Sequence, residues 1–382
     1  MRKASWAKPP RRRLGAALGI GALAVILAAC GSSSSSSSPS GSSSSSSGKK
    51  SISIGLSNYY SGNLWRKEMV ASFVQQAQVA QKEGYVSKFT TADSNGSVPQ
   101  QASQIESMIV QGYNAIVIDA ASPTALNGAI AKACAAHITV VVFDSLATAP
   151  CAYKVATSYE KYGQLETQYL ADQLHGKGNV LIVRGIAGNS VDNDIYKGMQ
   201  DILSKYPNMK VVGQVHGEFT ESVTQQAVAG ILPSLPHVDG VLTEGDDAGG
   251  ALKAFQQANK KPLPLVIMGN AGQDLQEWTA LLKTQPSYQT ISVSSYPSMS
   301  SVALWEASMI ANGKKVPKLV YAPVLTIPKE NLPAWTKAMS YTQIANTALT
   351  QADAEKFVAA SAAGKPIYVA SPLPNGTGLV GS

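Results

Sequence analysis

The chain has 382 residues, of which 45% are hydrophobic and 14% are charged. Its formal charge of +7 would suit an acidic partner, but six of its 31 basic residues lie within the first 13 positions. The 25 basic residues that remain face 24 acidic ones, so the charge gives no support to nucleic-acid binding, and we expect no nucleic-acid partner.

Residues 1–29 have the composition of an export signal. A basic segment without acidic residues precedes the apolar run LGAALGIGALAVILAAC (14–30). This run is too short and too rich in Gly and Ala for a membrane span, which needs about 20 strongly apolar residues. Its end, Leu27-Ala28-Ala29-Cys30, resembles the lipobox of bacterial lipoproteins, which implies cleavage before Cys30 and a lipid on its sulfur. An ordinary signal peptide is the alternative, and the sequence leaves the general and twin-arginine export routes open.

The segment that follows, GSSSSSSSPSGSSSSSSGKK (31–50), cannot bury apolar surface. Such a Ser-rich tract is typical of a flexible tether. Residues 30–50 are therefore expected to be a lipidated Cys and a tether, which would hold the protein on the extracytoplasmic face of the cell membrane. Roughly 330 residues remain, which is more than one hydrophobic core usually holds, so we expect two domains.

From residue 51 onward, short Val- and Ile-rich runs alternate with segments of helical periodicity. This alternation predicts an α/β fold with two doubly wound parallel sheets, covered by helices on both faces. In the first set, strands are expected at 51–56, 85–94, 113–120 and 138–145, with helices at 65–84, 98–112 and 123–137. In the second set, strands are expected at 178–188, 209–217, 238–247 and 264–272, with helices at 160–176, 192–207, 221–236, 248–260 and 273–285. A strand at 288–297 and a helix at 301–314 follow, and are expected to return to the first domain.

Two cysteines, Cys134 and Cys151, remain beside Cys30. In an exported chain an isolated pair favours a disulfide, with two buried free thiols as the alternative. The four histidines show no metal-ligand spacing, so we expect neither a metal nor a cofactor.

Parallel α/β sheets bind ligands at the carboxyl ends of their strands. In this chain the expected strand ends are polar, Gly-rich or aromatic, and they come from both sets of strands. One cleft between two domains would collect all of them: SNYYSGNLWR (57–66), DAASP (119–123), FDSLA (143–147), RGIAGNSVDND (184–194), TEGDD (243–247) and GNAG (269–272).

Several of these stretches, in order and spacing, resemble the ribose-type (type I) periplasmic sugar-binding proteins of bacterial ABC transporters. The most specific are GIAGNSVDNDIYKG (185–198) and VLTEGDDAGGAL (241–252), and the resemblance runs from about residue 51 to 325. It implies two lobes joined by a three-segment hinge, with crossings near 155–158, 293–296 and 320–325. The lobes would then comprise 51–156 plus 295–322 and 157–294 plus 323–340, with 341–382 as an extension whose role stays open.

The resemblance also implies a set of ligand contacts. Asn63 and Trp65 fall where the first loop supplies an amide and a stacking ring, and Asp144 falls where an Asp grips sugar hydroxyls. Elsewhere the family's usual residue is replaced, which leaves ribose itself in doubt. The changed positions are Asp119 (usually Asn), Ser145 and Asn193 (each usually Arg), Gly245 (usually Asn, with Asp246 beside it), Asn270 (near the usual Asp) and Ser295 (usually Gln).

The aromatic loop NYYSGNLWR (58–66) suits a sugar, whose C–H face packs on a ring while carboxylates, amides and guanidinium groups hold its hydroxyls. Tyr60 and Trp65 are candidate rings, although both could pack beneath the loop instead. Arg66 and Arg184 are the only arginines after residue 13, and both end predicted strands or loops. Each could hold ligand or form a structural ion pair. The candidate aspartates could likewise cap the helices that follow them.

The sequence therefore predicts a monomeric solute-binding protein rather than an enzyme. Neither G-x-S-x-G nor H-E-x-x-H occurs. The expected partners are a sugar or polyol, an ABC permease in the cytoplasmic membrane and the membrane itself through the lipid. A binding protein that reports to a membrane receptor is the alternative, and a secreted carbohydrate-active enzyme is a weaker one.

Overall fold

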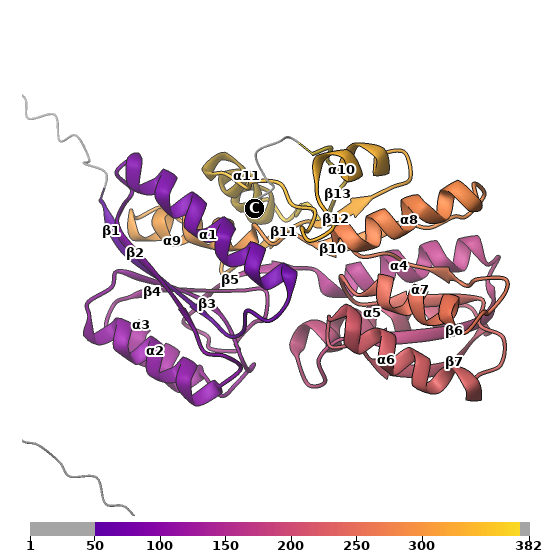
Figure 1. The fold of residues 1–382 in the computed structure, drawn as a ribbon. Helices are drawn as coiled ribbons and strands as arrows, with labels where there is room; N and C mark the ends of the chain where they lie inside the picture. Colours follow the sequence, from indigo (N-terminus) through magenta and orange to yellow (C-terminus); the bar gives the residue numbers. More distant parts are fainter. Residues whose placement is uncertain (1–49, 375–382) are drawn as a thin grey trace, which may run out of the picture. The chain divides into compact units, whose positions relative to one another are not determined.

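The computed structural model describes residues 50–374, so the expected signal, Cys30 and almost all of the tether lie outside the described residues. The described chain contains two parallel β-sheets, each with helices on both faces, and a small third sheet (Figure 1). The predicted fold class, two doubly wound parallel lobes of the type I periplasmic-binding-protein kind, is thus confirmed.

The first lobe is built on a six-stranded, fully parallel sheet with the strand order β11-β5-β4-β3-β1-β2. Helices α1 and α9 cover one face and α2 and α3 the other, while α11 packs on α9. The strands are β1 (Ile52–Asn58), β2 (Val86–Asp93), β3 (Ala115–Asp119), β4 (Thr139–Phe143), β5 (Tyr153–Thr157) and β11 (Leu319–Ala322). The helices are α1 (Leu64–Lys82), α2 (Val98–Val110), α3 (Asn127–Ala135), α9 (Met299–Ala311) and α11 (Gln351–Ala362).

The central strands β3 and β4 are apolar except for Asp119 and Thr139 at their ends, because both faces of the sheet are covered. On β3, Ala115 and Val117 belong to the core beneath α1 and α9, whereas Ile116 and Ile118 belong to the core beneath α2 and α3. Successive side chains of a strand point to opposite faces, so one strand serves two cores. Helix α9 is buried along nearly its whole length, which explains why its sequence lacks a polar stripe.

The second lobe is built on a four-stranded parallel sheet with the order β7-β6-β8-β9. Helices α4 and α5 pack together on one face, and α6, α7 and α8 on the other. The strands are β6 (Lys177–Arg184), β7 (Asn208–His216), β8 (Gly240–Thr243) and β9 (Leu265–Val266). The helices are α4 (Tyr159–Gln173), α5 (Ser190–Leu203), α6 (Glu221–Ile231), the 3₁₀ turn η1 (Leu232–Ser234), α7 (Ala248–Gln257), α8 (Gly272–Thr284) and α10 (Leu332–Ala338).

The chain passes between the lobes three times, and the strand expected at 288–297 lies at the second crossing and not in the first-lobe sheet. The chain leaves the first sheet from β5 into α4, returns between β10 (Ser292–Ser295) and α9, and leaves again between β11 and β12 (Val324–Ile327). Strand β10 pairs with β12 antiparallel, and β12 pairs in turn with β13 (Val369–Ala370) to form the third sheet. The lobe boundaries drawn from the sequence remain a prediction.

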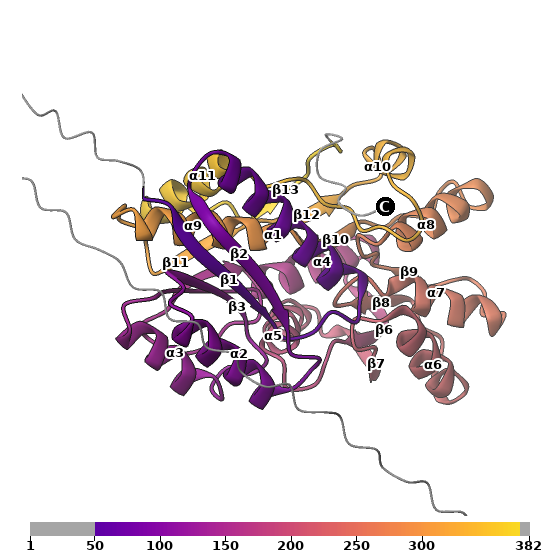
Figure 2. The same ribbon diagram turned by 60° about the vertical axis from the view of Figure 1, so that its left-hand side comes forward.

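The C-terminal extension is folded as far as residue 374. Helix α11 lies beside α9 and β11 of the first lobe, whereas α10 lies beside α8 of the second lobe in both ribbon views (Figure 2). A capping box holds the start of α11, because the Thr350 side chain accepts from the Asp353 N–H and the Asp353 carboxylate accepts from the Thr350 N–H.

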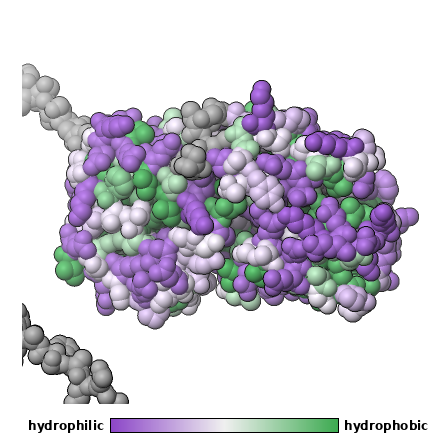
Figure 3. All heavy atoms as spheres, viewed as in Figure 1, coloured by the Kyte–Doolittle hydropathy of each residue, from purple (hydrophilic) through white to green (hydrophobic). Residues whose placement is uncertain are grey.

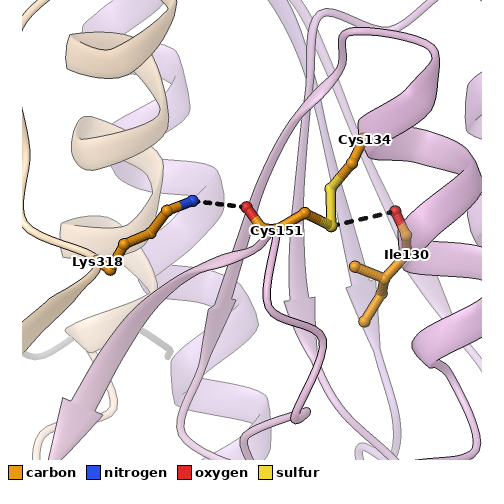
Figure 4. The surroundings of a disulfide bond; sticks show 4 residues. All are labelled: Ile130, Cys134, Cys151 and Lys318. Carbon is orange, nitrogen blue, oxygen red and sulfur yellow. Dashed lines mark hydrogen bonds between the residues drawn. A yellow bond between two sulfur atoms is a disulfide. The ribbon is translucent and has the colours of Figure 1, made fainter.

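A disulfide joins Cys134 on α3 to Cys151 in the turn before β5, as expected from the sequence. Figure 4 shows Lys318 donating a hydrogen bond to the Cys151 carbonyl at 2.8 Å, which ties the same turn to the segment before β11. At the amino end of β1, the Lys50 N–H donates to the Asn312 amide oxygen at 2.8 Å, and Asn312 Nδ2 donates to the Lys50 carbonyl at 3.2 Å. Lys50 is therefore fixed to the end of α9.

Hydrophilic residues are spread widely over the face seen in Figure 3, with smaller hydrophobic areas between them. Within residues 50–374 no helix combines the length and the apolar character that a membrane crossing requires.

Candidate functional site

A cavity of about 300 Å³ lies where the two lobes and the hinge meet. The first lobe, the second lobe and strand β10 all contribute to its wall. The lining residues are Gly62, Asn63, Leu64, Trp65, Arg66, Lys67 and Asp144 from the first lobe; Tyr159, Tyr162, Val191, Phe219, Thr220, Glu221, Ser222, Glu244, Gly245, Asp246 and Gln273 from the second lobe; and Ser294 and Ser295 from β10.

The start of α1 builds the first-lobe wall. Asn63 is the N-cap, and its side chain accepts a hydrogen bond from the Arg66 N–H at 2.9 Å. An Asn in this position satisfies one of the free N–H groups of the first turn and so fixes where the helix begins. Trp65 Nε1 donates to the Ser295 carbonyl at 3.2 Å, and the ring is only 8% exposed. The ring is thus held against the hinge while it lines the cavity.

Arg66 is the centre of a buried charge network. Its guanidinium forms ion pairs with Asp119 and, at 3.3 Å, with Asp144, and also donates to Ser145 Oγ at 3.3 Å. Asp144 also accepts a hydrogen bond from the Tyr159 hydroxyl, which lies on the first helix of the second lobe. Two buried carboxylates need a cation, and a planar guanidinium can serve both.

The backbone of Asp144 is strained, because its φ is +56°, in the left-handed region that non-glycine residues rarely adopt. The residue directly follows β4, and its carboxylate contacts Arg66 and Tyr159. Burial and the neighbouring Asp144 carboxylate raise the pKa of Tyr159 above its usual value, so Tyr159 stays a hydrogen-bond donor. Backbone strain of this kind is characteristic of binding sites.

The second-lobe wall carries carboxylates with few cations. Burial raises the pKa of Asp246 to about 7, although the Asn270 N–H at 2.6 Å and Ser294 Oγ at 3.4 Å both donate to it. Burial likewise raises the pKa of its neighbour Asp247 to about 6. Asp274, behind them, has a pKa raised by burial and by the Asp246 charge. A pKa of about 7 means that the wall residue Asp246 is partly protonated near neutral pH.

Arg184 has a structural partner set. Its guanidinium binds both oxygens of Asp192 at 2.8 and 2.6 Å and lies 3.1 Å from the Glu244 carboxylate. Glu244 lines the cavity and also accepts from the Gly185 N–H at 2.9 Å, whereas Arg184 does not line the cavity. Burial, followed by the charge of Asp192, raises the pKa of Glu244. Arg184 thus holds the wall residue in place, as the ion-pair alternative expects.

Phe219 contributes an aromatic side chain from a loop with positive φ values of +55° at Glu218 and +54° at Phe219. Its ring occupies the space beside Gly185 and Gly245. A Cβ at Gly185 would lie 2.0 Å from the ring, and one at Gly245 would lie 2.9 Å from it. The Phe219 ring therefore takes the space that a side chain at position 245 would need.

Six of the twelve ligand-binding candidates line the cavity, four are buried behind the wall and two lie elsewhere. The lining group is Asn63, Trp65, Arg66, Asp144, Asp246 and Ser295. The group behind the wall is Asp119, Ser145, Arg184 and Asn270, each hydrogen-bonded or ion-paired to a neighbour. Tyr60 is half-buried beside Gly62, and Asn193 is exposed on α5. The ligand contacts themselves remain a prediction.

Several wall residues were missed by the sequence reasoning. Tyr159 and Tyr162 are three residues apart at the start of α4, directly after the first crossing, and their spacing on one helix face was a usable signal. Tyr162 donates to the Val293 carbonyl of the hinge at 3.0 Å. Phe219 gave no signal, because a loop residue with positive φ belongs to no periodic pattern.

The cavity wall can bind a neutral polar solute. It offers carboxylates, hydroxyls and amides for hydrogen bonds, together with the rings of Trp65, Tyr159, Tyr162 and Phe219. Within residues 50–374, His, Cys, Asp and Glu side chains form no group of three that could hold a metal ion.

Comparison with known proteins identifies the family. Residues 54–315 match the periplasmic binding protein domain family. A xylitol-binding protein of Mycolicibacterium smegmatis is 32% identical over 176 residues, which are 45% of this chain and 50% of that protein. The ribose import binding protein of Bacillus subtilis is 26% identical over 279 residues, 72% of this chain and 87% of that one.

A solved structure supports the same assignment. An ABC transporter solute-binding protein from Thermobispora bispora superposes with a TM-score of 0.77 and 34% identity, covering 85% of this chain and 99% of that chain. The family match at 54–315 includes every residue that lines the cavity. The chain belongs to the periplasmic binding protein domain family.

Proposed function

We propose that the protein captures a sugar or polyol in the cavity between its lobes and delivers it to an ABC importer. One observation supports this most strongly: a cavity of about 300 Å³, lined from both lobes and the hinge by rings and hydrogen-bonding groups. Relatives named for xylitol and ribose binding support the same class of solute.

In this proposal the solute completes the contact between the lobes. Its hydroxyls would bond to Asp144 and Asn63 on one side and to Asp246 on the other, and its C–H face would pack on Trp65. Because both lobes then touch the same molecule, binding shifts the hinge equilibrium toward the closed form. A permease that recognises the closed form would accept loaded protein only.

We also propose that the protein is an exported, monomeric lipoprotein, and that it binds its solute without catalysing a reaction. The sequence Leu27-Ala28-Ala29-Cys30 supports lipidation, and an anchor would raise the concentration of the carrier near its permease. Mass spectrometry of membrane-extracted protein should find a diacylglyceryl group at an N-terminal Cys30. Cys30→Ala should release the protein from the membrane fraction.

Isothermal titration calorimetry with pentoses, hexoses and polyols tests the binding function. We expect micromolar or tighter binding to at least one, weakened about tenfold or more by Trp65→Ala and by Asp144→Asn, because each removes a ring contact or a charge-assisted hydrogen bond. Lys210→Ala, on the exposed surface of β7, is the matched control and should bind normally. No binding across the panel would contradict the proposed solute class.

A further inference from the structure

The C-terminal extension binds both lobes, beside the cavity, within two consecutive residues. Ala345 donates its N–H to the Asn270 carbonyl at 2.8 Å, in the second lobe. Just before it, the Gln343 carbonyl accepts from the Gly272 N–H at 2.7 Å, and Ile344 forms an antiparallel bridge with Ala271. The extension therefore adds a short strand to the loop 269–272.

The next residue, Asn346, belongs to the first lobe. Its side chain is 1% exposed and donates to Ser72 Oγ at 3.0 Å and to the Glu68 carboxylate at 3.3 Å, both on α1. Its amide oxygen accepts from the Ser298 N–H at 3.3 Å, at the start of α9. Ser298 Oγ in turn donates to the Thr347 carbonyl at 2.7 Å. A buried amide with three protein partners is fixed in orientation.

The residues that the extension contacts lie directly behind residues that line the cavity. On one side, the Asn270 N–H donates to the wall residue Asp246 at 2.6 Å. On the other side, Glu68 lies on the first turns of α1, the helix that begins with Trp65 and Arg66. The extension thus connects the ring and guanidinium of one wall to the carboxylate of the other.

Only one peptide bond separates the residue that binds the second lobe from the residue that binds the first. Ala345 and Asn346 are joined by one peptide unit, whose Cα atoms are about 3.8 Å apart. The lobes cannot separate at this point unless one set of hydrogen bonds breaks, so any opening motion has to pivot here. The extension then crosses back, because α11 packs on the first lobe and β13 pairs with β12, while Trp335 Nε1 donates to the Pro372 carbonyl at 3.1 Å.

We propose that segment 343–347, held by Asn346, is a positioning element of the binding site that fixes the pivot of the hinge and keeps the two cavity walls in register. This inference rests on the proposed function, because register matters only if a solute touches both walls. Without the pivot, the protein would spend less time in the arrangement that binds solute, and the apparent dissociation constant would rise in proportion.

The first experiment measures affinity for the sugar or polyol that the calorimetric panel identifies. Asn346→Ala should weaken it about tenfold, the order expected when buried hydrogen bonds are lost. Asn331→Ala is the control, because it also removes a side-chain hydrogen bond to the extension, from Asn331 Nδ2 to the Ser371 carbonyl. This part of the extension is held in addition by the pairing of β13 with β12 and by the bond from Trp335 to Pro372. Asn331→Ala should change the affinity less than twofold.

The second experiment measures the lobes directly. Spin labels on Gln111→Cys and Lys210→Cys, exposed positions of the two lobes, report the inter-lobe distance distribution without ligand. Asn346→Ala should broaden this distribution, whereas Asn331→Ala should leave it unchanged. The double variant Glu68→Gln/Asn346→Asp allows a hydrogen bond with donor and acceptor exchanged, and should restore part of the affinity and the narrow distribution.

The outcomes separate this inference from the proposed function. If the wild type binds a sugar and Asn346→Ala binds it equally well with an unchanged distance distribution, the pivot is wrong and the function stands. If Asn346→Ala lowers the affinity only in proportion to its loss of free energy of unfolding, and the inter-lobe distance distribution does not broaden, the segment has only a structural role and the proposal fails. If the wild type binds no sugar, the function fails and the distance distribution alone decides the pivot.

Discussion

The carboxylates at the first-lobe wall of the cavity share one cation, whereas two buried carboxyls of the second lobe, Asp246 and Asp247, form no ion pair within residues 50–374. Asp119 and Asp144 share Arg66. Asp246 and Asp247 have backbone and hydroxyl donors, and burial raises their pKa values to about 7 and about 6. A carboxyl with a pKa raised this far changes its charge within the physiological pH range. The charge of these second-lobe carboxyls is therefore adjustable by pH.

The largest effect should come from removing the cation of the first wall. Arg66→Met leaves Asp119 and Asp144 buried without their partner, and breaking a buried pair in this way costs about 3–5 kcal/mol of folding free energy. Urea denaturation measures it. Lys132→Ala, which removes the exposed partner of Glu106 at 2.5 Å, is the control and should cost less than about 1 kcal/mol. Similar losses in the two variants would contradict a special role for the Arg66 network.

The next effect should be the pH dependence of the second wall. Because the folded-state pKa of Asp246 is raised above its unfolded value, the folded protein binds the extra proton, and stability falls as pH rises from about 4 through about 7. The raised pKa of Asp247 acts in the same direction. A shift of this size corresponds to at most about 4 kcal/mol over that window. Lowered pKa values at the exposed Asp201 and Glu355 act in the opposite direction.

Denaturation of Asp246→Asn between pH 4 and 8 tests this. The variant cannot ionise at this position, so its stability should fall less steeply with pH and should exceed that of the wild type at the alkaline end. Lys132→Ala, which alters an exposed ion pair of the first lobe, is the control and should keep the wild-type slope. Equal slopes in the wild type and Asp246→Asn would show that Asp246 is ionised throughout, and the comparison of the two walls would fail.

The smallest effect should come from the disulfide, which lies in the first lobe away from both walls. The bridge joins residues 17 positions apart, and removing it with Cys134→Ser/Cys151→Ser should cost about 3 kcal/mol through the freedom regained by the unfolded chain. The pH dependence of stability should not change, because the adjustable carboxyls belong to the second lobe. Reduced wild-type protein should behave as the variant does. A changed dependence of stability on pH in the variant would contradict the expectation that the disulfide does not affect the second-lobe carboxyls.

Much of the fold could be predicted because the covered parallel strands are continuous apolar runs and the helices have clear periodicity. The predicted 98–112 and 273–285 correspond to α2 and α8 with small differences at the ends. Strand β5 was not predicted, because its sequence YKVAT (153–157) is not a continuous apolar run and contains the charged Lys154. It also directly follows a disulfide-bonded turn. The extension could not be placed, since its elements are held by contacts with residues far away in the chain.

The candidate site was predictable where it follows strand ends. Asn63, Trp65, Asp144 and Asp246 line the cavity for this reason. The sequence could not show which of the charged candidates face one another. Arg184 lies behind the wall because Asp192, one turn into the next helix, binds it in bidentate fashion, and only coordinates reveal such a pairing.

The two hydrogen bonds between Lys50 and Asn312 determine where the preceding chain joins the folded body. Lys50 stands before the amino end of β1, whereas the cavity residues 62–67 follow the carboxyl end of the same strand. A strand of this length measures about 20 Å. A membrane attachment upstream of residue 50 would therefore pull on the amino end of β1, at the end of the strand remote from the cavity. Tension on the attachment would then neither cover the cavity nor distort the residues that line it.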